Sequence, residues 1–148
     1  MKYLGLDLGT KTLGISISDI NGKISLPLTT LRYNNEDYEY LISNLEKIVL
    51  ENKIEKIVLG FPKNMNNTIG ERALKTLEFQ KMLEEKLNVE VYMQDERLST
   101  VSSEKFLIDN DISRKKRKQV IDKMASQIIL QSFLDKKNNE KENWNGRK

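Results

Sequence analysis

The sequence predicts an α/β fold with a mixed sheet, in which a three-stranded antiparallel meander precedes alternating strands and helices. Apolar residues alternate with a period of two near the N-terminus, and farther along they recur at helical spacing between short apolar runs. The length of 148 residues suits one domain, and 38% hydrophobic with 32% charged residues suits a soluble one. We therefore expect a single domain over residues 1–135, with its sheet flanked by helices.

The meander is predicted at the N-terminus. In residues 3–8 leucines occupy every second position, and Asp7 lies on the opposite face of this strand. A second alternating run covers 13–18. Because Asn21-Gly22 is a strong hairpin signal, the third strand is expected near 24–31.

Helices and strands then alternate along the chain. Apolar spacing and capping residues predict four helices, over residues 36–52, 71–87, 100–107 and 114–135, the first capped by Asn34 or Asn35. Short apolar runs predict two strands, over 54–60 and 89–94. This order of elements is that of ribonuclease H-like folds. The polar tail 136–148 is expected to be disordered.

The composition excludes several kinds of chemistry. The chain has no cysteine and no histidine, which excludes disulfides, thiol catalysis, histidine general bases and most zinc sites. Catalysis would have to use carboxylates, lysine, arginine, hydroxyls or a hard metal ion. The N-terminus carries Asp7 inside its only apolar stretch, so it resembles neither a signal peptide nor a membrane anchor. We expect a cytoplasmic protein without membrane contact.

The basic charge gathers near the C-terminus. Residues 1–112 hold 14 basic and 18 acidic residues, whereas 113–148 hold 11 basic and 4 acidic residues. The run Arg114, Lys115, Lys116, Arg117 and Lys118 opens the last predicted helix. It could hold a polyanionic backbone through salt-sensitive phosphate contacts. The alternative is an ordinary solvated helix start.

Asp7 is a candidate site residue because an unpaired carboxylate within an apolar strand is costly. It needs a hydrogen-bond donor, a cation or an opening to solvent. The alternative to a site is that Asp7 accepts hydrogen bonds from the Gly9-Thr10 turn. The hairpin pattern Asp7–Gly14 also resembles the first phosphate loop of actin-like and sugar-kinase ATPases, but those proteins need two such domains.

Asp95 and Glu96 follow the strand 89–94, and catalytic groups of open α/β sheets commonly lie just beyond strand carboxyl ends. Strand alternation places the two carboxylates on opposite faces, so one of them can turn toward Asp7. The other would pair with Arg97 or cap the following helix. The alternative is a common charged surface turn.

Asp122 lies on a face of the last helix that is otherwise apolar or small. Ala125 and Ser126 on that face would let the helix approach the sheet closely and bring the carboxylate toward the first strand. The alternative is a boundary aspartate paired with Lys118 or Lys123.

Three carboxylates from a first strand, a later strand end and a last helix could converge on hard divalent cations such as Mg²⁺. Two such ions about 3.5–4 Å apart can activate water and stabilise the leaving oxygen of a phosphodiester. This chemistry needs neither histidine nor cysteine.

Four segments of the chain resemble the motifs of the YqgF family, and the resemblance extends from Tyr3 to about Asp135. The segments are Leu4–Lys11, Gly60–Met65, Asp95–Thr100 and Ile121–Ser126. Members of this family are regarded as Holliday junction resolvases and as nucleases that process the 5′ end of pre-16S ribosomal RNA. The chain departs from the family pattern at Ser16 and Ser126, where alanine is usual, and at Asn67, where glycine is usual.

The resemblance implies a ribonuclease H-like fold, a cytoplasmic location and cleavage of nucleic-acid phosphodiesters with Mg²⁺ or Mn²⁺. The family's acidic site matches Asp7, Glu96 and Asp122, which would hold metal and carry catalysis. By the same matching, Lys11 and Arg97 would contact phosphate or orient the carboxylates.

We therefore expect a metal-dependent endonuclease that processes the 5′ end of pre-16S rRNA. The alternatives are a resolvase of four-way DNA junctions and an RNA-binding ribosome-assembly factor without catalysis. Phosphate contacts do not separate RNA from DNA. A monomer would suit trimming of one RNA strand, whereas symmetric cutting of a junction would need two active sites and hence a homodimer.

Overall fold

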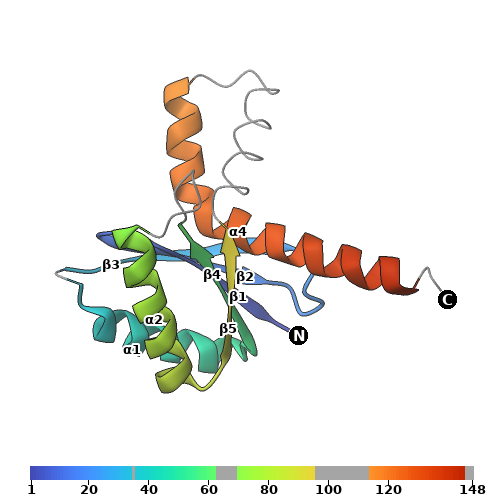
Figure 1. The fold of residues 1–148 in the computed structure, drawn as a ribbon, viewed down its shortest axis with the longest axis horizontal. Coiled ribbons are helices and arrows are strands. Elements are labelled where there is room, and N and C mark those ends of the chain that lie inside the picture. Colours follow the sequence, from blue (N-terminus) through green and yellow to red (C-terminus); the bar gives the residue numbers. More distant parts are fainter. Residues whose placement is uncertain (35, 63–69, 96–113, 146–148) are drawn as a thin grey trace.

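A computed structural model describes residues 1–34, 36–62, 70–95 and 114–145, with only the backbone described over 114–123 and 140–145. Within these residues five strands form one sheet in the order β3-β2-β1-β4-β5 (Figure 1). The strands are β1 (Tyr3–Leu8), β2 (Thr12–Ser18), β3 (Ser25–Arg32), β4 (Lys56–Phe61) and β5 (Glu90–Asp95). The first three pair antiparallel, whereas β1, β4 and β5 pair parallel. The predicted mixed sheet with an N-terminal meander is confirmed.

Both faces of the sheet are buried, each against different helices. The inward leucines of β1 pack with Ile57 and Leu59 of β4 and with apolar residues of α1 (Tyr38–Asn52) and α2 (Glu71–Leu87). On the other face, Tyr3 and Val58 pack against α4 (Arg114–Asn145). The expectation that the strand at 54–60 is central is confirmed, because consecutive residues of β4 contribute to both cores.

The helix α1 begins later than predicted. Its cap is Asp37, whose carboxylate accepts a hydrogen bond from the Tyr40 amide at 3.2 Å, so the predicted caps Asn34 and Asn35 are wrong. It ends where Lys53 adopts a left-handed conformation. The bounds of α2 match the prediction.

The helix α4 continues to Asn145, so its predicted end at Asp135 is wrong. From Arg114 to Asn145 the sequence contains neither glycine nor proline. Residues beyond 135 also contact β1 and the turn between β2 and β3. Lys137 donates a hydrogen bond to the Tyr3 hydroxyl, and the Asn138 amide donates to the carbonyl of Gly22 at 3.3 Å. The division into a domain over 1–135 and a tail over 136–148 stays a prediction.

The predicted short helix at 100–107 and the turn after it lie outside the described residues. None of the helices in the described ranges is both long enough and apolar enough to cross a membrane.

Candidate functional site

Asp7 lies near the carboxyl end of β1 on the face that packs against α4. It is half-buried, and it stands opposite Gly14 of β2 in the antiparallel register. No hydrogen bond or ion pair to the Asp7 carboxylate is found within the described part of the chain. The backbone amide of Gly9 donates to the Thr12 carbonyl at 2.8 Å and is therefore not available to Asp7. This geometry leaves the carboxylate open to a cation.

The helix α4 crosses this face antiparallel to β1. A Cβ at Gly5 would lie 2.7 Å from the Leu130 Cβ, and one at Gly14 would lie 3.4 Å from the Ser126 Oγ. A hydrogen bond stabilises the contact between β2 and α4, because the Ser16 hydroxyl donates to the Ser126 carbonyl at 2.8 Å. The chain of α4 therefore runs from Ser126, beside the end of β1, to Leu130, beside its middle.

Asp122 belongs to α4 and precedes Ser126 by one helical turn, a rise of about 6 Å. At Ser126, α4 runs antiparallel to β1, so going backward along the helix from Ser126 leads toward the carboxyl end of β1. Figure 1 shows that α4 changes direction between its first turns, drawn in orange, and its red C-terminal part. The backbone of Asp122 is helical and lies one turn before Ser126, and its approach to Asp7 stays a prediction.

Asp95 lies on the opposite face of the sheet from Asp7. It pairs with Phe61 of β4, and Phe61 shares a face with Leu59, which belongs to the core beneath α1 and α2. Glu96 lies outside the described residues.

The other predicted residues are described only in part. Lys11 is exposed in the turn between β1 and β2. Arg97 lies outside the described residues, and of the basic run 114–118 only the helical backbone is described. No group of three potential metal ligands occurs among the described side chains, a set that contains Asp7 but neither Glu96 nor Asp122.

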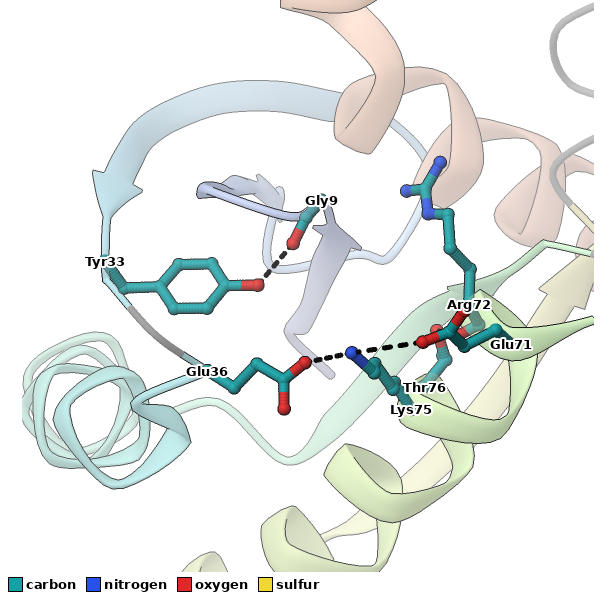
Figure 2. A network of polar contacts seen from close by, with 7 residues as sticks. All are labelled: Gly9, Tyr33, Glu36, Glu71, Arg72, Lys75 and Thr76. Carbon is teal, nitrogen blue, oxygen red and sulfur yellow. Dashed lines mark hydrogen bonds and ion pairs between the residues drawn. The ribbon is translucent and has the colours of Figure 1, made fainter.

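The prediction missed Arg72, a residue of the first turn of α2. Its guanidinium donates a hydrogen bond at 3.0 Å to the carbonyl of Leu8, the residue that directly follows Asp7 in β1. Figure 2 shows the guanidinium pointing away from Lys75 and Glu36. A basic residue in a first helical turn is unfavourable for the helix dipole, and this was the signal available in the sequence.

Polar contacts hold the β1–β2 turn from the side of α1 and α2 (Figure 2). The Tyr33 hydroxyl donates to the Gly9 carbonyl, and burial raises the pKa of this phenol. Lys75 pairs with Glu36 and, at 3.6 Å, with Glu71. The hydrogen bond to Glu36 raises the pKa of Lys75, so the lysine is charged at neutral pH. The turn beside Asp7 is therefore held by Tyr33, which precedes α1, and by Arg72 of α2.

Comparisons with known proteins identify the family and relatives of the chain. A family model described as "RuvX: Holliday junction resolvase" matches residues 1–136. A protein of Geobacillus sp. (strain WCH70) named as a pre-16S rRNA nuclease is 51% identical over 93% of the chain and 99% of its own length. A protein of the same name from Bacillus subtilis (strain 168) is 50% identical over 93% of the chain and 100% of its own length.

Two solved structures share the fold. RuvC of Thermus thermophilus in complex with a Holliday junction substrate superposes with a TM-score of 0.59, at 10% identity, over 94% of this chain and 96% of that one. A second RuvC structure from Thermus thermophilus gives a TM-score of 0.52 at 13% identity, over 70% of this chain and 68% of that one. The predicted ribonuclease H-like fold class is confirmed.

Proposed function

The chain belongs to the RuvX family of Holliday junction resolvases, and from this membership we propose that it is a metal-dependent endonuclease that processes the 5′ end of pre-16S rRNA. The observation that carries the proposal is the half-buried Asp7 carboxylate, which has no partner among the described residues and faces the helix that bears Asp122. Relatives about half identical over nearly their whole length are named for this substrate. Maturation of rRNA would place the protein in the cytoplasm.

The proposed site consists of Asp7, Glu96 and Asp122. Carboxylates are the donors that Mg²⁺ and Mn²⁺ prefer, so this donor set fits such a metal. When bound, the metal would supply a nucleophilic water and stabilise charge on the phosphate. The carboxylates would fix its position on the α4 face. Lys11, Arg97 and the basic run 114–118 would hold the phosphates on either side of the cleaved bond.

Arg72 extends this phosphate-binding role to the start of α2. Its guanidinium lies beside the carbonyl of Leu8, one residue past Asp7, and part of the side chain is exposed. Guanidinium groups bind phosphate oxygens in a planar, two-pronged geometry. Arg72 would therefore orient a phosphate at the carboxyl end of β1.

Cleavage of a four-way DNA junction is the second candidate. It is favoured by the description of the family and by the RuvC structure in complex with a junction substrate, which shares the fold. Both candidates use the same carboxylates, so they differ in substrate and in the number of active sites.

The test is cleavage of an end-labelled pre-16S leader RNA and of a synthetic four-way DNA junction, side by side, with Mg²⁺ or Mn²⁺. Asp7→Asn removes one ligand charge while keeping the side chain's shape, so it should reduce cleavage by at least about a hundredfold. Binding of either nucleic acid should persist.

Asp95→Asn is the matched control, because Asp95 lies on the opposite face, and it should retain cleavage. Wild-type cleavage that persists in Asp7→Asn would contradict the proposed site. Binding of RNA without cleavage by the wild type would favour the non-catalytic assembly factor.

A further inference from the structure

A groove of about 370 Å³ lies between the edge strand β5 and the C-terminal half of α4. Its lining is Tyr92, Met93, Gln94, Phe133, Lys136 and Lys137. No residue assigned to metal binding or phosphate contact above belongs to it. It therefore needs an explanation of its own.

The floor of the groove is aromatic. The rings of Tyr92 and Phe133 lie 5.3 Å apart at an interplanar angle of 31°, and both side chains are half-buried. The Tyr92 hydroxyl donates to Glu90 at 2.7 Å, which holds the ring in place at the sheet edge. Such fixed rings with exposed area offer a surface on which a planar base can stack.

The rim of the groove is basic. Lys136 and Lys137 are both exposed, and the ammonium of Lys137 lies 4.9 Å from the centre of the Tyr3 ring. The nearby carboxylate of Glu90 is neutralised by Lys56 at 2.5 Å. Aromatic rings beneath exposed lysines complement a polyanion that carries bases better than they complement a protein surface.

The groove opens on the face that carries Asp7. In the parallel registers, Leu6 of β1 pairs with Leu59 of β4, which pairs with Met93 of β5. The residues that follow Leu6 and Met93, Asp7 and Gln94, are therefore also aligned across the sheet and separated by two strand spacings. With the usual strand spacing this separation is about 10 Å. A nucleic-acid strand whose cleaved bond lies at Asp7 can therefore place the adjacent nucleotides in the groove.

We propose that this groove binds a single-stranded RNA segment flanking the cleavage site, with a base stacked on Tyr92 and Phe133 and phosphates on Lys136 and Lys137. The inference rests on the proposed function and specifies the substrate near the cleaved bond. A base within a duplex is stacked on its neighbours and does not present its face to the rings. The preferred substrate is thus unpaired beside the scissile phosphate.

The test measures binding without metal, so that it does not depend on cleavage. The probe is a single-stranded oligouridylate of about eight nucleotides, titrated in EDTA and followed by fluorescence anisotropy. Tyr92→Leu keeps apolar volume but removes the stacking ring, and it should weaken binding roughly 5- to 100-fold. Lys136→Gln with Lys137→Gln should weaken binding and lower the salt slope by about 1.

The matched control is Lys81→Gln with Lys86→Gln, an equal charge change at exposed positions of α2 on the other side of the sheet. It should lower the salt slope less than the groove variant does. Thermal unfolding of each variant checks that the fold is kept. Unchanged affinity in Tyr92→Leu, or binding of fully paired RNA as tight as that of the oligouridylate, would overturn the proposal.

Photocrosslinking gives a readout that loss of stability cannot imitate. An oligonucleotide carrying 5-iodouridine should crosslink to the peptide that contains Tyr92 or to the one that contains Phe133. Crosslinks confined to other peptides would contradict the groove. Because Asp7→Asn can serve as the protein in both experiments, failure of the groove is distinguishable from failure of the proposed catalysis.

Discussion

Gly5 sets the distance between α4 and the sheet. A Cβ at this position would lie 2.3 Å from the Ser16 Oγ and 2.7 Å from the Leu130 Cβ, both far inside van der Waals contact. The side chain is therefore excluded as long as Ser16 and Leu130 keep their places. The approach of α4 to β1 at Ser126 and Leu130 therefore depends on this missing side chain.

Gly5→Ala should destabilise the fold by about 1–3 kcal/mol, because the added methyl group overpacks the contact between β1 and α4. Urea unfolding of the variant measures the change in the free energy of unfolding. Gly14→Ala is the matched control, since its Cβ would meet the Ser126 Oγ at an ordinary 3.4 Å. Equal losses in the two variants would contradict this account of the packing.

Sequence reasoning at the residue scale predicted the face of the strand on which Asp7 lies, because that environment is local. Alternation within one strand shows both the apolar face and the carboxylate opposite it. Arg72 could not be found in this way, because its partner Leu8 is 64 positions away in the chain. The face of the sheet on which Asp95 lies likewise needed the register of β5 against β4, which no local pattern provides.

The turn between β2 and β3 shows how one carboxylate can hold an element together. The Asp19 Oδ1 accepts hydrogen bonds from the amides of Lys23 at 2.8 Å and Ile24 at 3.0 Å. Gly22 takes a positive φ of 66°, which a side chain would strain. The amides of Ile24 and Lys23 lower the pKa of Asp19 below its usual 3.8.

A lowered folded-state pKa means that Asp19 stabilises the fold above its unfolded-state pKa, and that this contribution is lost as pH falls through the folded-state value. The difference in unfolding free energy between wild type and Asp19→Ala should therefore be full at pH 6 and shrink below about pH 4. Chemical unfolding across this pH range measures it. A difference that stays constant down to the lowest pH would show that the ionised carboxylate is not what holds the turn.

Elements were predicted well where apolar periodicity and a chain break coincide. The bounds of α2 were exact, because Gly70 precedes the helix and Asn88 ends it in a left-handed conformation. The start of α1 was missed because three polar residues compete for the cap, and only the folded backbone brings Asp37 to the Tyr40 amide. The end of α4 was missed because polarity alone does not reveal the contacts of Lys137 and Asn138 with the meander.

The larger core and the proposed site lie on opposite faces of the sheet. One face of the sheet is filled by α1 and α2, whereas the other carries α4, Asp7 and the groove beside β5. The basic run 114–118 opens the same helix α4. A polyanion bound by that run would thus reach the face of Asp7 along one element.

Changing Lys115 and Lys116 together to glutamine should weaken nucleic-acid binding and lower its salt slope by about 1–2, since each lost phosphate contact removes roughly 0.7–0.9. Titrations at several salt concentrations measure the slope. The control is Lys47→Gln with Lys81→Gln, both exposed on helices of the opposite face. A slope equal to that of the wild type would make the basic run an ordinary solvated surface.

At this scale the order of elements predicted the mixed sheet, because antiparallel hairpins and crossover helices permit few topologies. Sequence patterns alone do not determine whether Asp7, Glu96 and Asp122 meet, since these residues are far apart in the chain. The convergence that we propose would depend on the crossing of α4 over β1, which is fixed by the close contacts at Gly5 and the hydrogen bond from Ser16.

The most direct test of the metal-dependent site is Mn²⁺ binding to the protein alone, measured by electron paramagnetic resonance. We expect Asp7→Asn, Glu96→Gln and Asp122→Asn each to weaken binding at least about tenfold, because each removes one carboxylate ligand from a shared ion. Asp95→Asn, on the opposite face, should bind as the wild type does. Wild-type affinity in Asp7→Asn, or an equal loss in Asp95→Asn, would contradict the assignment of the metal to the α4 face of the sheet.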